Sequence, residues 1–199
     1  MTVGLTAHFF MGGMTIDRRG ASTVPGLYGA GEVTGGIHGA NRLGGNALTE
    51  AVVFGRIAGA SAAHDSPEAL PAAPAEIEGC GLPEEAARSL RREVQGLLWG
   101  GVGVVRSEDS LSRSRGRWEA AWKSFRGSSR SGSTNPSGFE VRNRLLVSRL
   151  ILEAALLRRE TRGAHYRTDF PGRDDQSWLG SIRVIRGGAE DAPVFSLPR

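Results

Sequence analysis

The chain has 199 residues, of which 39% are hydrophobic and 23% charged, and its net charge is +4, so it is large enough for one domain or two small ones with a buried core. No apolar run approaches the roughly 18 residues of a membrane-spanning helix, and the first residues lack the pattern of a secretory signal peptide, so we expect a cytoplasmic protein. Its one cysteine, Cys80, excludes a disulfide framework and an iron-sulfur cluster held by this chain alone, and we expect no metal site.

Charge and glycine are unevenly distributed along the chain. Residues 1–80 carry 4 basic and 7 acidic side chains, whereas residues 81–199 carry 21 and 14, so the net charge changes from −3 to +7. Of the 29 glycines, 14 lie within the first 60 residues. We therefore expect close approach of the backbone in the first part of the chain and a basic surface on the second.

A strand, a glycine-rich loop and a helix are predicted in the first part. Val24 to Tyr28 is typical of a short buried strand that leads into the loop 29–32. A second glycine-rich stretch covers residues 35–45, and Asn46 is then a plausible helix N-cap. The following positions share one face at helical spacing and are expected to pack on a neighbour: Leu48, Val52, Gly55 and Gly59.

Residues 64–82 form a predicted linker, rich in alanine, proline and glutamate, and three amphipathic helices follow it. The first begins at Pro83, with an apolar face of Ala87, Leu90, Val94, Leu97 and Gly101. The second is capped at Ser107 and has an inward face of Leu111, Trp118, Trp122 and Phe125. After a loop over residues 126–138, the third spans 140–159, with a stripe of Val141, Leu145, Leu152, Ala155 and Leu156. A tail that contains a strand near residues 182–185 ends the chain.

Three stretches carry a resemblance to a known family. They are His8 to Gly13 (HFFMGG), the 23 positions from Gly26 to Leu48, and Glu160 to Pro171 with the nearby residues up to Trp178. Together they resemble the flavoprotein subunit of fumarate reductase and succinate dehydrogenase. The resemblance implies an α/β fragment of an FAD-binding domain (residues 1–63), a linker (64–82), and an all-α, three-helix C-terminal domain with an extended tail (83–199).

The resemblance is to the C-terminal portion of that family alone. The family's N-terminal GxGxxG motif and its capping domain have no counterpart in this sequence. We therefore expect a fragment of an FAD-dependent oxidoreductase that interconverts fumarate and succinate by hydride transfer at the flavin N5 atom. By itself the chain is expected to be inactive and to bind FAD weakly or not at all.

The resemblance also implies which residues hold the flavin. Glu32 corresponds to an acid that contacts the ribityl chain, and the start of the helix near Asn46 presents free N–H groups and a positive dipole end to the flavin ring. The residues expected to bind FAD are Gly31, Glu32, Asn41, Gly45, Asn46, Ala47 and Leu48.

Two residues match the family's substrate-binding positions, His8 and Arg42. An arginine can hold one carboxylate of a small dicarboxylate with two parallel hydrogen bonds, so Arg42 suits this role. His38 either shapes its loop or contacts flavin and substrate. The general acid of the family is an arginine expected upstream, so no catalytic residue is assigned in this chain.

Two alternatives remain open. A fragment of L-aspartate oxidase would have the same histidine and arginine positions. The arginine-rich second half could instead be an interaction module that docks an iron-sulfur electron-transfer subunit, which would place the protein in the cytoplasm or at the inner membrane face through a partner complex. A polyanion could also bind there, although we expect no nucleic acid. In the tail, one set of charged residues is expected to form a salt-bridged network: Arg162, His165, Arg167, Asp169, Asp174 and Asp175.

Overall fold

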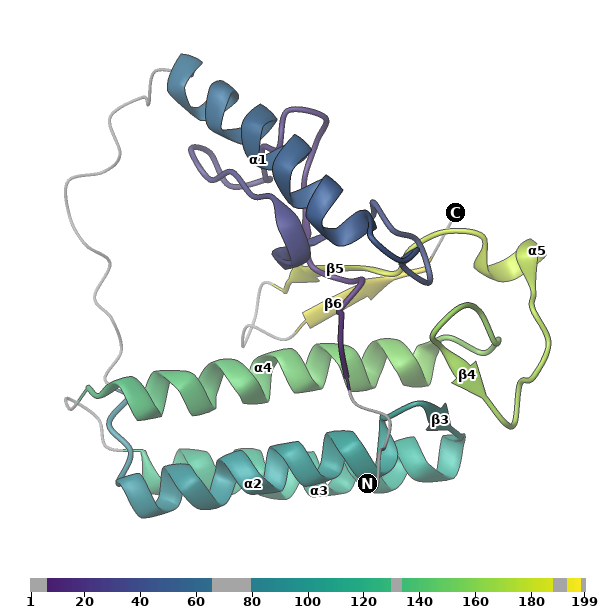
Figure 1. The fold of residues 1–199 in the computed structure, drawn as a ribbon. Helices are drawn as coiled ribbons and strands as arrows, with labels where there is room; N and C mark the ends of the chain where they lie inside the picture. Colours follow the sequence, from purple (N-terminus) through teal and green to yellow (C-terminus); the bar gives the residue numbers. More distant parts are fainter. Residues whose placement is uncertain (1–6, 66–79, 130–133, 188–192, 198–199) are drawn as a thin grey trace, which may run out of the picture. The chain divides into compact units, whose positions relative to one another are not determined.

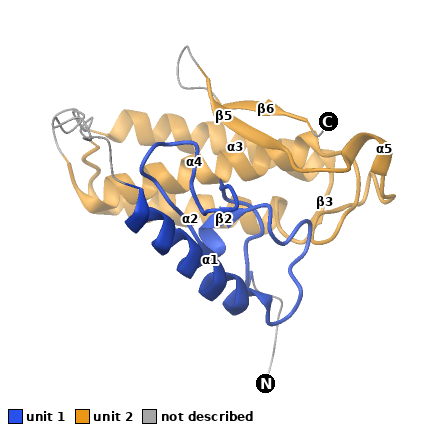
Figure 2. Cartoon of the chain, turned by 90° about the horizontal axis from the view of Figure 1, so that it is seen from above, with its two compact units in different colours: residues 1–73 blue, residues 74–199 orange. Residues whose placement is uncertain are grey.

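A computed structural model describes residues 7–65, 80–129, 134–187 and 193–197. The chain divides into two compact units, Met1–Ala73 and Pro74–Arg199 (Figure 2). Among the described residues, no helix is both long and apolar enough to cross a membrane.

The first unit consists of short strands and one long helix. Its elements are β1 (Met14–Thr15), the 3-10 helix η1 (Gly31–Val33), β2 (Thr34–Gly35) and α1 (Asn46–His64). β1 pairs with β2 in parallel. A Cβ atom on Gly13 would lie 2.3 Å from the Val33 carbonyl oxygen, so only glycine allows this close approach.

The predicted strand from Val24 to Tyr28 is instead a turn. Gly26 has a φ of +77°, and the Leu27 N–H donates to the Val24 carbonyl oxygen over 3.1 Å. Val24 and Leu27 are exposed, and Tyr28 makes one isolated bridge with Ala21. The proline–glycine pair, which the sequence places inside the segment, forces this turn.

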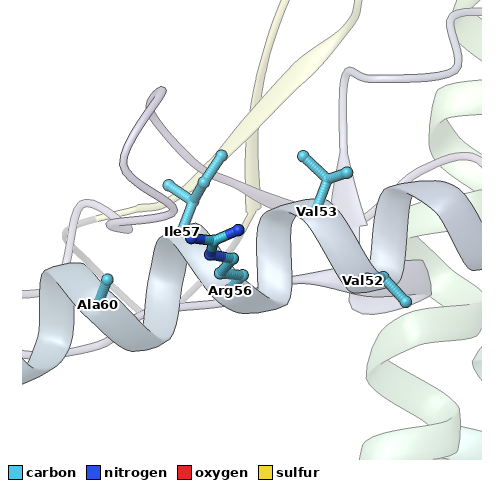
Figure 3. Close-up of a pocket in the computed structure, with 5 residues that line it drawn as sticks. All are labelled: Val52, Val53, Arg56, Ile57 and Ala60. Carbon is cyan, nitrogen blue, oxygen red and sulfur yellow. The ribbon is translucent and has the colours of Figure 1, made fainter.

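Helix α1 turns a different face inward from the one predicted. Leu48 is 78% exposed and Val52 is 72% exposed, whereas Glu50 and Ala58 are the buried residues of this helix. Asn46 is the first helical residue, so the N-cap is Gly45, whose φ of +81° is a left-handed conformation that favours glycine. Figure 3 shows the side of α1 that carries Val52, Val53, Arg56, Ile57 and Ala60.

The second unit is built on three helices that pack side by side: α2 (Glu84–Gly101), α3 (Glu108–Ser128) and α4 (Pro136–Leu157) (Figure 1). The predicted face of α2 is buried at every position. Ser107 caps α3 through a capping box with Ser110, as expected, and Asn135 caps α4. The expected loop 126–138 is shorter than predicted, because α3 runs to Ser128 and α4 begins at Pro136. With the partial α/β unit before it, this helical domain confirms the predicted fold class.

The apolar core lies between these three helices. Trp118 is buried and its indole N–H donates to the Leu145 carbonyl oxygen over 2.9 Å, which joins α3 to α4. Gly101 lets α2 approach α3, since a Cβ there would lie 1.9 Å from the Ser114 hydroxyl. The buried apolar residues of the core are Cys80, Leu82, Ala87, Leu90, Val94, Leu97, Val102, Leu111, Trp118, Ala121, Phe125, Val141, Leu145, Leu152 and Ala155. Trp122 and Leu156, also predicted to face inward, are partly buried against this core.

Short strands and a small helix follow α4. β3 (Val105–Arg106) pairs in parallel with β4 (Tyr166–Arg167), so the connection that follows α2 lies beside the residues that follow α4. The helix α5 (Asp175–Trp178) is a single turn. The expected strand near residues 182–185 is β5 (Arg183–Arg186), which pairs antiparallel with β6 (Pro193–Ser196).

A fully buried arginine completes the C-terminal end of α4. Arg167 donates from Nη1 to the Ala155 carbonyl oxygen over 2.8 Å, and it pairs with Asp169 at 2.7 Å and with Glu108 at 3.2 Å. The last carbonyl groups of a helix have no partner within the helix, and the C-terminal end of its dipole favours a cation. Arg167 satisfies both requirements at this end.

A second buried charge, Glu160, joins part of the predicted salt-bridged network, although it is not among the residues expected there. It accepts hydrogen bonds from Arg158 at 2.6 Å, from Arg162 at 2.7 Å and from the Asp174 backbone N–H at 2.9 Å. Arg162 also pairs with Asp175 at 2.6 Å. These contacts fix the segment after α4 on itself and on Arg158, the C-terminal cap of α4, while the pair between Arg167 and Glu108 reaches α3. Arg162, Arg167, Asp169 and Asp175 form ion pairs as expected, whereas His165 contacts Arg106 and the Arg158 carbonyl oxygen, and Asp174 caps Ser177.

Two adjacent leucines of α4 test the helical core. Leu145→Ala should lower the free energy of unfolding by about 2–5 kcal/mol, because Leu145 is fully buried and its truncation leaves a cavity. Leu146→Ala is the matched control, since Leu146 is 41% exposed and should change stability by less than about 1 kcal/mol. Urea denaturation measures both, and equal losses would contradict the assigned core.

His165 should make stability depend on pH. Its Nδ1 lies 2.7 Å from Arg106 Nη1, and burial together with this charge lowers the pKa of His165 to about 4. Because the unfolded histidine titrates near 6.5, the unfolded state binds more protons between pH 6.5 and 4. The contribution of His165 is therefore complete above pH 6.5 and declines as pH falls towards 4, by at most about 3 kcal/mol.

His165→Asn provides the comparison for this titration. The variant lacks the titrating group, so its unfolding free energy, measured by urea denaturation at several pH values, should fall less steeply between pH 6.5 and 4 than that of the unchanged chain. Parallel curves for the two proteins would exclude His165 as the source of the slope.

Candidate functional site

The site residues predicted from the sequence and described by the structure lie in the first unit, and the turn before η1 positions one of them. Gly31 has a φ of +79°, which bends the backbone so that Glu32 follows within η1. The Glu32 Oε1 atom accepts a hydrogen bond from the Phe10 backbone N–H over 2.8 Å. Glu32 therefore joins the turn to the segment that contains His8. Its other carboxylate oxygen, Oε2, could accept a hydrogen bond from a hydroxyl group.

Arg42 lies against the residue that follows His8. Its guanidinium carbon is 4.6 Å from the centre of the Phe9 ring, a cation–π contact. The other contact of this ring is with His38, edge to face, with ring centres 5.3 Å apart. Arg42 also donates from Nη1 to the Leu43 carbonyl oxygen over 3.1 Å. The structure thus brings Arg42 and His38 to the segment of His8, and Phe9, which the sequence reasoning passed over, joins them.

Arg42 and His38 each keep a buried nitrogen without a hydrogen-bond partner among the described residues. These atoms are Arg42 Nε and His38 Nε2. His8 itself is exposed. A buried donor without a partner is costly, so Arg42 Nε is a candidate for contact with a bound molecule or water, whereas His38 Nε2 faces Glu50 Oε2 at 4.0 Å.

The start of α1 presents free backbone N–H groups. Gly45 occupies the N-cap and makes no side-chain capping bond. The Asn46 N–H donates to the Leu43 carbonyl oxygen over 3.3 Å, whereas the N–H groups of Ala47 and Leu48 have no capping side chain. A Cβ placed on Gly44 or Gly45 would meet no atom within 4 Å. The helix start is therefore open and electropositive, which suits an anionic or electron-rich partner. Asn41 lies exposed in the same loop.

The sequence reasoning missed one buried acid, Glu50. Its Oε1 atom accepts the Gly31 backbone N–H over 2.9 Å, and its side chain is 4% exposed. It lies on the inward face of α1 with Phe54 and Ala58, at spacings of four residues. That periodicity, with Ala47 one turn earlier, was the signal that could have placed Glu50 on the buried face.

Taken together, Glu32, Arg42 and His38 form a polar cluster on the segment of residues 9–10, and the loop that carries His38 and Arg42 leads into the start of α1. It combines a carboxylate at the turn, an arginine and a histidine packed on Phe9, and an open helix N-terminus. Such a set can hold a molecule that carries both hydroxyl groups and negative charge. No group of three or more potential metal ligands occurs in the part of the chain that the structure describes.

Comparison with known proteins identifies two sequence families along the chain. The profile described as "Fumarate reductase flavoprotein C-term" matches residues 91–195, and that of an FAD-binding domain matches residues 1–48. The second match contains the whole polar cluster, whereas Glu50 lies just beyond it. FAD is therefore the cofactor of this family.

Individual relatives agree with this. The chain is 38% identical to one CoM/CoB fumarate reductase subunit of Methanothermobacter marburgensis, over 94% of this chain and 36% of that protein. It is also 38% identical to the L-aspartate oxidase of Streptomyces coelicolor, over 97% of this chain and 37% of that protein. The structure of Mycobacterium smegmatis Sdh1 in complex with UQ1 is similar with a TM-score of 0.76 and 34% identity, over 96% of this chain and 35% of that chain.

The chain thus spans a little over a third of the length of the curated relatives it matches. Within that third, the family profiles match most of both units. The chain therefore belongs to the family of FAD-dependent oxidoreductases that contains the fumarate reductase, succinate dehydrogenase and L-aspartate oxidase flavoproteins.

Proposed function

We propose that this chain supplies the substrate side and the flavin edge of an FAD-dependent oxidoreductase that interconverts fumarate and succinate. The observation that carries the proposal is a pair of contacts: Glu32 binds the backbone of Phe10, and Arg42 packs on Phe9. Through them, the proposed flavin-binding acid and the proposed substrate-binding arginine meet on the segment that follows His8.

The residues fit a flavin in their donor and acceptor types. The free N–H groups at the start of α1 suit the ring edge that gains negative charge on reduction, and Glu32 suits a hydroxyl of the ribityl chain. We assign flavin binding to Gly31, Glu32, Asn41, Gly45, Asn46, Ala47 and Leu48. Bound FAD would supply hydride exchange at its N5 atom.

The substrate would be held by His8 and Arg42. The planar guanidinium of Arg42 can donate two parallel hydrogen bonds to one carboxylate, and the Phe9 ring holds it in place. His8 can donate to the second carboxylate. We assign neither residue as general acid; in this proposal the proton comes from a further arginine of the complete enzyme.

L-aspartate oxidase is the second candidate, because a relative of that name is as similar to this chain as the fumarate reductase relative is, at 38% identity. For the basic second unit we propose the docking of an iron-sulfur electron-transfer subunit, because the charge of residues 81–199 is +7.

The first unit is poorly equipped to hold FAD alone. Among its described residues, 7–65, Ala58 is the one buried apolar side chain, while Leu48 and Val52 on α1 stay exposed. So small an apolar core contributes little to the organisation of a site as large as that of FAD, which then rests on local polar contacts and on the rest of the enzyme. The second unit, in contrast, buries its own core.

The chain alone should therefore elute without stoichiometric flavin after mixing with FAD, and should not reduce fumarate with a reduced dye. A chimera that joins it to the N-terminal two thirds of the Methanothermobacter marburgensis protein should retain FAD and turn over. Flavin absorbance after gel filtration and dye oxidation measure the two properties. Stoichiometric FAD with turnover in the chain alone would refute the first expectation, and a chimera that folds without binding FAD would refute the proposed function.

A second chimera, with the N-terminal part of the Streptomyces coelicolor L-aspartate oxidase, decides between the two substrates. If this chain prefers fumarate and succinate, both chimeras should favour them over L-aspartate. Oxidation of L-aspartate by both chimeras would instead assign the chain to the oxidase.

Arg42→Lys tests the arginine in the first chimera. Because lysine cannot form the two parallel hydrogen bonds or stack in the same way on Phe9, kcat/KM for fumarate should fall by about 100-fold while the FAD content stays unchanged. Arg56→Lys is the control, since Arg56 is an exposed residue of α1. Equal activity of the two variants would remove Arg42 from the substrate site.

A further inference from the structure

Glu50 is a buried carboxylate whose two oxygens have different surroundings. Oε1 accepts the Gly31 N–H over 2.9 Å and lies 3.5 Å from the Thr34 hydroxyl. That hydroxyl has one proton, and its shorter contact, 2.8 Å, is with the Gly31 carbonyl oxygen. The Gly31 N–H is therefore the main donor to Oε1.

The other oxygen faces an imidazole. Glu50 Oε2 lies 4.0 Å from His38 Nε2, and neither atom has a hydrogen-bond partner among the described residues. The two side chains are only 4% and 9% exposed. A buried carboxylate oxygen and a buried ring nitrogen without partners are each costly, and a proton on Nε2 makes them complementary.

We propose that Glu50 is a positioning residue that holds two loops at once, the Gly31 turn through Oε1 and the His38 loop through a proton on His38 Nε2 that is donated towards Oε2. The acid is anchored in α1, so the helix start, the turn and the loop keep one arrangement. In the proposed function, that arrangement fixes the position of the flavin-binding acid Glu32 relative to the substrate-binding Arg42. The linkage through Glu50 itself does not depend on that function.

Gly31 and His38, the two residues that Glu50 holds, are themselves connected to the polar cluster. Gly31 opens η1, which contains Glu32, and the His38 ring packs edge to face on Phe9. The guanidinium of Arg42 lies on the same Phe9 ring, with its central carbon 4.6 Å from the ring centre. A movement of Glu50 would therefore reach both Glu32 and Arg42 through these contacts.

The linkage is tested in the 199-residue chain by NMR. The unchanged chain should show a slowly exchanging imidazole N–H signal that disappears in His38→Asn, together with a protected Gly31 amide. Glu50→Ala should remove the imidazole signal and speed exchange of the Gly31 amide by about five- to tenfold, the effect of one lost hydrogen bond.

Glu50→Gln keeps the side-chain volume and serves if Glu50→Ala unfolds the first unit. A glutamine has one acceptor oxygen, so it can serve Gly31 or His38 but not both, and one of the two signatures should disappear. Glu85→Gln, at a side chain that is 85% exposed, should leave both unchanged. An unchanged chain without the His38 signal, or a Glu50→Gln variant that keeps both signatures, would overturn the proposal.

The first chimera separates this inference from the proposed function. There, Glu50→Gln should weaken FAD binding by about tenfold, with the helical unit's thermal transition unchanged. If the unchanged chimera bound no FAD while the NMR signatures held, the proposed function would fail and the linkage would stand. FAD binding that Glu50→Gln leaves unaltered would exclude a positioning role.

Discussion

The hydrogen bond between the Glu50 carboxylate and the Gly31 N–H ties helix α1 to the turn before η1, and the proposed arrangement of the site depends on it. Apolar packing cannot supply that order, because Ala58 is the one buried apolar side chain among residues 7–65. What holds the turn, the glycine-rich loop and α1 together is instead a set of polar and aromatic contacts. Two of them, from Glu32 to Phe10 and from Arg42 to Phe9, end on the same segment.

The helical unit follows the sequence pattern closely because its stability comes from apolar faces. Every position predicted for the face of α2 is buried, since an apolar stripe of helical period has one way to leave water. The start of α4 was missed. Asn135 and Pro136 are a cap and a first-turn residue, but they lie in a serine- and glycine-rich stretch that is also typical of a loop.

The first unit was harder to predict for a related physical reason. Its helix α1 buries Glu50 and exposes Leu48 and Val52, which reverses the rule that assigned the inward face. A buried acid is the exception to that rule, and it needs partners distant in the sequence, here Gly31, that hydrophobic periodicity cannot reveal. The proposed site residues came from a family resemblance, and their contacts with Phe9 and Glu50 became visible only in three dimensions.

The difference between the units also determines what a stability measurement on this chain reports. The second unit has the apolar core and the fully buried charges Glu160 and Arg167, so a cooperative transition reflects mainly that unit. The polar contacts of the first unit can open locally at much lower cost. A substitution in the proposed site can therefore leave the main transition unchanged and still disorganise the site. Local observables, such as the exchange of one amide or the signal of one imidazole, are consequently the appropriate measure of whether these residues are in place.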